Sequence, residues 1–141
     1  MQKTSKDFLN QLVAAGHRLT AVRRLIIDFL QQSQKPATAL ELQGVITKKL
    51  RPVNKTTVYR ELELLLNNNI VVEINFGDNK KRYEIAGLPH HHHLVCSNCD
   101  KVEDVFIDRD LHQLEQKITK EKSFTVHSHS LEFFGLCQDC N

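Results

Sequence analysis

The chain has 141 residues, of which 40% are hydrophobic, and it carries 19 Lys and Arg against 17 Asp and Glu. This length fits one domain or two small ones with packed cores. Residues 1–15 lack the apolar stretch and cleavage site of a secretory signal, and every apolar run is too short to cross a bilayer. We therefore expect a soluble, cytoplasmic protein without a membrane partner.

Charge and metal-binding residue types divide the chain into two parts. Residues 1–88 carry 14 Lys and Arg against 8 Asp and Glu, whereas residues 89–141 carry 5 against 9. Seven of the eight histidines and all four cysteines lie in the second part. Because Gly87, Leu88 and Pro89 interrupt the pattern, we predict two domains, 1–87 and 88–141, with different tasks.

The first domain begins with a helical pattern. A short apolar stripe ends at Gly16, a residue suited to a helix C-cap. Thr20 can cap a second helix, which Pro36 breaks. Thr38 and Glu41 have the spacing of a capping box for a third helix.

A fourth helix and a hairpin complete this domain. Asn54 introduces the helix, and three asparagines at 67–69 end it. Ile70, Val72, Ile74 and Phe76 then alternate with other residues and predict one face of a strand. Residues 77–79 predict a turn, and residues 80–85 a returning strand. Helices followed by a hairpin, in this order, predict a winged helix-turn-helix.

The fourth helix and the hairpin carry groups suited to DNA. Arg60 can bind a phosphate or a guanine edge, and Tyr59 offers an aromatic face to thymine methyl groups. Basic residues at the hairpin turn, Arg82 among them, suit the DNA backbone. A merely solvated helix face would carry similar charges, but the order of the elements favours DNA contact. The predicted DNA-binding residues are Arg18, Thr56, Thr57, Tyr59, Arg60, Lys80 and Lys81.

Two CxxC pairs give the sharpest signal in the second domain. They are Cys96 with Cys99, and Cys137 with Cys140. Disulfides are rare in cytosolic proteins, whereas four thiolates satisfy a tetrahedral, closed zinc site. A redox dithiol would need one CxxC at a helix start in a βαβ unit, which this pattern lacks. We predict one structural Zn²⁺ per chain at these four cysteines.

A run of four histidines precedes the first pair of cysteines and leads into a strand. Because side chains alternate along a strand, His91 and His93 should face one way, and His90 and His92 the other. That arrangement predicts two metal sites, although idle histidines on a solvated edge are the alternative. We place His112 at the start of a helix. The remaining donor candidates are Glu84 and Asp104, together with His127 and His129 on one face of a last strand from Thr125 to Phe134.

Four stretches span nearly the whole chain in order. They are Gly16-x-Arg18-x-Thr20-x-x-Arg23, Thr57-Val58-Tyr59-Arg60-x-Leu62, His90-His91-His92-His93-Leu94-x-Cys96-x-x-Cys99, and His129-Ser130 with Cys137-x-x-Cys140. Together they resemble the ferric uptake regulator (Fur) family, which includes zinc-, manganese-, nickel- and peroxide-sensing members. The resemblance implies a homodimer paired through its C-terminal halves, whose metal loading closes two winged helices onto a double-stranded DNA operator, usually as a repressor.

The resemblance also implies ligand sets. The regulatory site corresponds to Glu84, His91, His93 and Asp104. An additional site corresponds to His90, His92 and His129, with His112 at or beside the place of a carboxylate. Pro36 and Ala86 stand where many members have a further histidine and a hinge cysteine. Donors rich in imidazole suit Zn²⁺, Fe²⁺, Ni²⁺ or Co²⁺. We expect a second divalent metal, Zn²⁺, Fe²⁺ or Mn²⁺, at the regulatory site, with zinc or iron favoured.

The prediction is an α+β chain: a winged helix-turn-helix followed by a small α/β dimerisation domain with a four-cysteine zinc site. It would act as a metal-dependent transcriptional regulator, without a small organic substrate. A peroxide-responsive regulator of the same family is one alternative, and a metal-buffering protein or metallochaperone without a DNA role is another. A metalloenzyme is not expected, since the sequence has no HExxH, phosphate loop or Ser/His/Asp set.

Overall fold

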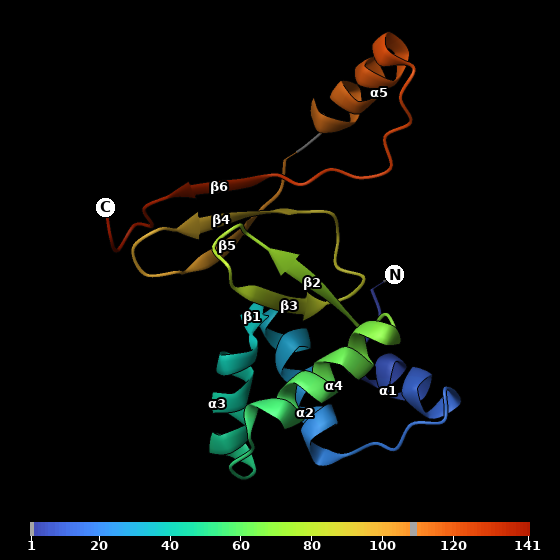
Figure 1. Cartoon of the computed structure of the whole chain (residues 1–141), viewed down its shortest axis with the longest axis vertical. Coiled ribbons are helices and arrows are strands. Elements are labelled where there is room, and N and C mark those ends of the chain that lie inside the picture. The colour runs from blue at the N-terminus through green and yellow to red at the C-terminus, as the bar shows by residue number, and fades with distance from the viewer. Residues whose placement is uncertain (1, 108–109) are drawn as a thin grey trace. The chain divides into compact units, whose positions relative to one another are not determined.

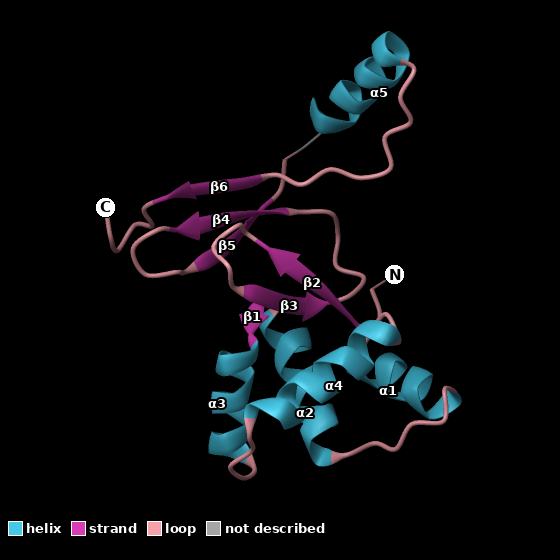
Figure 2. Cartoon of the chain, viewed as in Figure 1, coloured by secondary structure: helices cyan, strands magenta, loops and turns pink. Residues whose placement is uncertain are grey.

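A computed structural model describes residues 2–107 and 110–141 and divides the chain into two compact units, Met1–Pro89 and His90–Asn141. Figure 1 shows the elements in chain order, and Figure 2 shows that helices dominate the first unit. The mixture of helix and sheet agrees with the predicted fold class. Within the described residues, no helix combines the length and apolar character that a membrane crossing requires.

The first unit is the predicted winged helix-turn-helix. Its helices are α1 (Ser5–Ala14), α2 (Ala21–Ser33), α3 (Ala39–Lys49) and α4 (Lys55–Asn67). Its antiparallel sheet has the order β1-β3-β2, with β1 (Ala37–Thr38), β2 (Val71–Asn75) and β3 (Lys81–Ile85). One apolar core joins helices and sheet, and its fully buried side chains include Leu12, Ile27, Leu30, Ile46 and Leu65.

The helices begin where side-chain caps satisfy free backbone N–H groups. Thr20 accepts from the N–H of Arg23 at 3.2 Å, and Asn54 caps α4 through a 2.9 Å bond. Thr38 and Glu41 form the predicted reciprocal capping box, with distances of 2.7 and 3.2 Å. The Asn54 cap fixes the start of α4, the helix whose outward face was predicted to contact DNA.

The hairpin differs from the predicted alternation at Val71 and Val72. Ile70 and Phe76 are buried as expected, but Val72 is 42% exposed, whereas Val71 is buried opposite Ile85. Ile70 lies before the first residue of β2, and along β2 Val71 is buried, Ile74 is half-buried and the other residues are exposed, so burial does not alternate strictly. The two-residue strand β1 was not predicted, because it is too short to show any periodicity.

The second unit contains one sheet of order β5-β4-β6 and one helix. Its elements are β4 (His92–Cys96), β5 (Val102–Val105), α5 (Asp110–Lys122) and β6 (Glu132–Gly135). Strand β4 is central, antiparallel to β5 and parallel to β6. Figure 1 shows α5 beyond the end of this sheet rather than across its face.

The predicted last strand, from Thr125 to Phe134, is wrong over its first half. Residues 123–131 have no regular structure, and β6 begins only at Glu132. The ladder between β4 and β6 starts at His93 and Glu132. Because β4 itself begins at His92, residues before Glu132 have no neighbouring strand to bond, whatever their alternation.

A buried ion pair joins α2 to α4. Arg23 is 7% exposed, and its guanidinium binds both carboxylate oxygens of Glu61 at 2.8 and 3.1 Å. A third donor of the same guanidinium bonds the backbone carbonyl of Arg18. The pair therefore holds α4 and the segment before α2 to one side chain.

Replacing Glu61 by Gln should destabilise the first unit by about 2–3 kcal/mol, because a largely buried guanidinium loses its charged partner. Glu61 keeps some contact with solvent, which limits the loss. The free energy of unfolding, measured by chemical denaturation, tests this. Glu63→Gln, on the exposed face of the same helix, should change it by less than about 0.5 kcal/mol; equal effects of the two variants would contradict the assigned pair.

Candidate metal centres and DNA-contact surface

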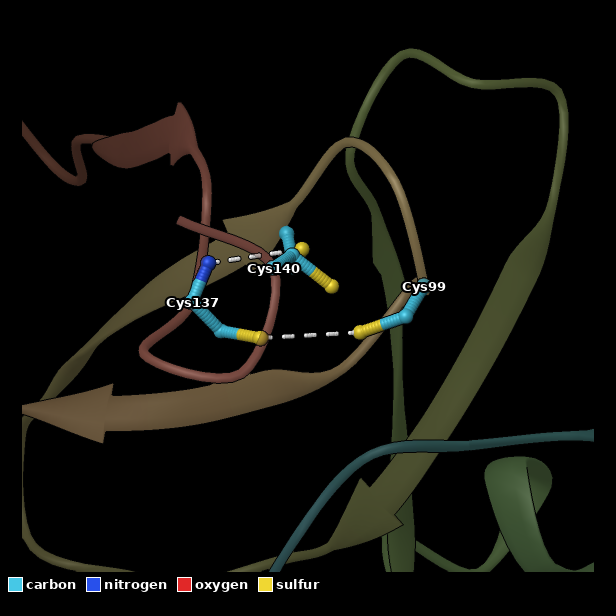
Figure 3. Close-up of side chains that lie close together, drawn as sticks. Cys99, Cys137 and Cys140 are labelled. Carbon is cyan, nitrogen blue, oxygen red and sulfur yellow. Dashed lines mark hydrogen bonds between the residues drawn. The ribbon is translucent and has the colours of Figure 1, made fainter.

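The four cysteines come together at one end of the sheet. Cys96 ends β4 and Cys99 lies in the turn before β5, whereas Cys137 and Cys140 follow β6. Their sulfur atoms all lie within 4.8 Å of one another, and Figure 3 shows the side chains of Cys99, Cys137 and Cys140 converging. Parallel pairing of β4 with β6 carries both CxxC turns to the same edge, because Cys96 is in register with Gly135.

The spacing of the sulfurs fits a metal and not a disulfide. Sγ of Cys99 and Sγ of Cys137 are 3.7 Å apart, and all four thiols are free. Zinc–sulfur bonds of about 2.3 Å in a tetrahedron place sulfurs about 3.8 Å apart, whereas a disulfide needs about 2.05 Å. Asn98 also donates a hydrogen bond to Sγ of Cys140 at 3.3 Å.

The electrostatics of the cluster favour a cation. The backbone N–H of Cys137 bonds Sγ of Cys96 at 3.4 Å and, with neighbouring N–H groups, lowers the pKa of Cys96 to about 6. The pKa of Cys99 is raised to about 12: the N–H of Lys101 lowers it, but the neighbouring thiols and burial outweigh that effect. One thiolate thus suppresses ionisation of another until a cation offsets the repulsion.

His91, His93 and Asp104 gather on one side of β4. Nε2 atoms of the two histidines are 3.1 Å apart, and Oδ1 of Asp104 lies 4.0 Å from the first and 3.7 Å from the second. Asp104 sits directly opposite His93 in the β4–β5 ladder. Strand register therefore brings together three of the four predicted regulatory donors. Glu84 belongs to the first unit, on β3 opposite Val72.

His90, His92 and His129 gather as a separate set. Their ring centroids are 4.8 to 5.2 Å apart, and one nitrogen of each lies within 4.8 Å of the others. The histidine run is thus divided between two sets, with His90 and His92 in one and His91 and His93 in the other. His129 reaches this set from the irregular loop after α5, not from a strand.

His112 does not join that set among the described residues. Its side chain is 75% exposed, and the carboxylate beside the set belongs to Glu115, one turn further along α5. Oε1 of Glu115 lies 2.5 Å from Nδ1 of His129. Sequence reasoning missed Glu115 because the family pattern pointed to the helix start. His127 lines the cavity next to this set without belonging to it.

Two buried polar atoms indicate that both histidine sets suit a cation. Among the described residues, Nε2 of His92 and Oδ1 of Asp104 are buried without a hydrogen-bond partner, an arrangement that costs free energy unless something else satisfies them. Burial lowers the pKa of His92, and His90 and His129 lower it further. A lowered pKa favours the neutral imidazole of His92, whose lone pair can bind a metal.

The predicted DNA-contact residues lie on exposed parts of the first unit. Tyr59 is 48% exposed, and Thr56 and Arg60 are exposed beside it on α4. Arg18 is exposed before α2, and Lys80 at the hairpin turn. These groups leave a polar and cationic face open for a ligand.

Three residues that were predicted to contact DNA interact with other side chains of the first unit. The Thr57 hydroxyl bonds Asn54 at 3.0 Å, and Lys81 pairs loosely with Glu73 at 3.7 Å. Arg82, grouped with the turn cations in the sequence, is buried: it pairs with Asp78 at 2.9 Å and stacks over the ring of Phe76. Because Arg82 on β3 is buried, it stabilises the hairpin turn and does not add to the exposed positive charge there.

Comparison with known proteins agrees with this geometry. The model of the ferric uptake regulator family matches residues 14–134. The ferric uptake regulation protein of Bacillus subtilis is 35% identical over 135 residues, covering 93% of this chain and 90% of that protein. The peroxide operon regulator of the same organism is 31% identical over 136 residues, covering 96% and 92%.

A solved structure matches the fold over nearly the whole chain. The ferric uptake regulator of Helicobacter pylori gives a TM-score of 0.84 at 24% identity, covering 98% of this chain and 94% of that one. At this identity the likeness shows the fold alone. The family match and the relatives of higher identity show more: the chain belongs to the ferric uptake regulator family of transcription regulators.

Proposed function

We propose that this chain is a metal-dependent repressor that binds an operator in double-stranded DNA and senses a divalent transition metal, with zinc or iron favoured. The observation that carries the proposal is the pairing, in one chain, of a winged helix-turn-helix with three clusters of metal-binding side chains. A metal-buffering protein would have no use for the first unit. Its exposed α4 face and basic excess support DNA binding.

A homodimer paired through the second unit is part of the proposal. Phe133, Phe134, Leu94 and Leu136 are each 39 to 57% exposed. Aromatic and aliphatic side chains gathered in this way on a small unit favour burial against another surface. A twofold dimer would also present two winged helices to a pseudo-palindromic operator.

DNA recognition is assigned to α4, with Arg60 as its main reader. Arg60→Ala should weaken binding to the operator by about 1–3 kcal/mol if the guanidinium contacts a base edge. Lys120→Ala removes the same charge from the second unit and should leave binding unchanged. Fluorescence anisotropy over a range of salt concentrations measures both. Operator affinity equal to wild type in Arg60→Ala would contradict the assignment of α4.

The cysteine cluster is assigned a structural Zn²⁺, since a closed set of four thiolates leaves no position for a substrate. The metal would tie the turn after β4 to the chain beyond β6, where the described unit has few buried apolar residues: Val95, Cys96 and Val102. Structural zinc contributes directly to folding in such small units.

Cys96→Ser should release this zinc and lower the melting temperature of the second unit. Metal analysis of the purified chain and thermal unfolding measure the two effects. His91→Ala serves as the control and should keep the cysteine-bound zinc. Undiminished zinc content in Cys96→Ser would refute the assigned site.

The regulatory site is assigned to His91, His93 and Asp104, with Glu84 from the first unit as the further donor. A metal held by donors of both units would bind one arrangement of the units better than others, and only such differential affinity can shift a population. Moving a mostly open population to a mostly closed one takes about 10⁴-fold preference, or roughly 5.5 kcal/mol.

His91→Ala should abolish the dependence of DNA affinity on added metal while keeping the cysteine zinc and the dimer. His90→Ala should have a smaller effect, because His90 belongs to the other histidine set. Operator titrations with and without Zn²⁺ or Fe²⁺ compare the two. Identical losses in both variants would show that the two sets do not act separately.

A peroxide-responsive regulator is the second candidate, favoured by the similarity to the B. subtilis peroxide operon regulator. The two functions separate in one experiment on the Fe²⁺-loaded chain. Loss of operator binding after brief exposure to hydrogen peroxide, with the zinc-loaded chain unaffected, would favour peroxide sensing. Equal operator binding before and after exposure would favour metal sensing.

A further inference from the structure

We propose that Arg23 and Glu61 are positioning residues for DNA recognition: the ion pair between them holds Arg18 and α4 in the relation that lets both contact one duplex. This inference rests on the proposed DNA-binding function and adds to it, because neither Arg23 nor Glu61 belongs to the exposed face assigned to DNA. The pair would act through the residues that it holds and not by touching DNA.

The guanidinium of Arg23 forms its hydrogen bonds within the first unit. Its Nε and Nη2 donate to the two carboxylate oxygens of Glu61 at 2.8 and 3.1 Å, and its Nη1 donates to the backbone carbonyl of Arg18. Arg23 is 7% exposed, and the side chain of Glu61 is 16% exposed. Because each of the three nitrogens already donates and the side chain is buried, Arg23 does not serve as a DNA contact itself.

The segment before α2 is held at two points by Arg23. Nη1 bonds the carbonyl of Arg18, and the backbone N–H of Arg23 bonds the hydroxyl of Thr20 at 3.2 Å. The backbone N–H of Arg24 also bonds the carbonyl of Thr20, at 3.0 Å. Arg18 itself is exposed. Its side chain therefore extends into solvent from a fixed backbone, and less conformational freedom is lost when it binds DNA.

Glu61 holds the other element that is assigned to DNA. Tyr59 and Arg60 are exposed on α4, whereas Glu61 is largely buried against Arg23 of α2. Successive residues of a helix point about 100° apart, so one side of α4 is bonded to α2 while the neighbouring side stays exposed. A bidentate pair of carboxylate and guanidinium is directional as well as strong. A single guanidinium thereby sets the position of α4 relative to Arg18.

The charge of Glu61 makes the proposal predict a direction opposite to that of simple electrostatics. Removing a carboxylate from a DNA-binding unit reduces repulsion of the phosphates and by itself strengthens binding. Removing the carboxylate of Glu61 also frees the guanidinium that holds Arg18 and α4, so loss of positioning weakens binding. Glu63 is exposed on the same helix and supplies a carboxylate of equal charge for comparison.

Fluorescence anisotropy with a duplex selected from random sequence by the zinc-loaded wild-type chain tests the proposal. Glu61→Gln should bind this duplex at least about fivefold more weakly than wild type, whereas Glu63→Gln should bind it as tightly or more tightly. Leu12→Ala removes a fully buried side chain from α1. It should lower the melting temperature at least as much as Glu61→Gln and keep the affinity, with circular dichroism reporting that each variant is folded during the titration.

Two results of these titrations would contradict the proposal. Wild-type affinity in Glu61→Gln would show that the ion pair does not position the DNA contacts. An equal loss of affinity in Glu63→Gln or in Leu12→Ala would assign the effect to charge or to general stability.

A double-mutant cycle with Arg18→Ala gives a readout that a merely structural role would not change. Because the pair acts partly through Arg18, Glu61→Gln should cost less affinity in the Arg18→Ala chain than in the wild-type chain. The double variant should therefore lose less than the product of the two single fold-losses. Single losses that multiply in full would refute the positioning of Arg18 by the pair.

Hydrogen exchange of the free chain supplies a readout without DNA. The backbone amides of Arg23 and Arg24 should exchange faster in Glu61→Gln than in Glu63→Gln, and equal exchange would overturn the proposed tie. Failure of the wild-type chain to bind any duplex would end the proposed function and this inference together. Tight binding by the wild-type chain and by Glu61→Gln alike would end this inference alone.

Discussion

The alternation of side chains along β4 is the constraint on which the arrangement of donors depends. A strand sends neighbouring side chains to opposite faces, so His92 and His93 at the start of β4 belong to different histidine sets. The flanking strands then supply partners by register. Asp104 arrives opposite His93 from β5, and β6 brings the second CxxC turn beside Cys96. Strand β4 thereby contributes one donor to each of the three clusters: His92, His93 and Cys96.

The proposed metal clusters would stabilise the second unit as well as bind the sensed metal. Its strands have four or five residues each, and several of its large apolar side chains are exposed rather than buried. A unit of this size cannot bury enough apolar area to offset its conformational entropy comfortably. Cross-links by bound ions and association with a second copy are the two devices that compensate, and the proposed zinc site and homodimer supply both.

Sequence patterns predicted the structural features that depend on residues close to one another in the chain. Helix caps at Thr20, Thr38 and Asn54 were recognisable because a cap and its target lie three residues apart. The opposite directions of His92 and His93 follow from strand geometry. The prediction of a strand from Thr125 was wrong because strand formation depends on long-range packing. The loop that carries His129 has no neighbouring strand with which to pair. Glu115 was missed for the same reason, because its approach to His129 is set by how α5 and that loop fold back, not by spacing.

In the proposed function, one unit binds DNA and the other binds metal, so metal binding must be coupled to the first unit. The proposed DNA contacts lie in the first unit, whereas the proposed metal donors, apart from Glu84, lie in the second unit. An ion held by the second unit alone would stabilise that unit equally in every arrangement and would shift no equilibrium. Control of DNA affinity therefore requires a donor from the first unit. Glu84, on the wing strand β3 shortly before the boundary after Pro89, is the donor that would convert metal binding from local stabilisation into regulation.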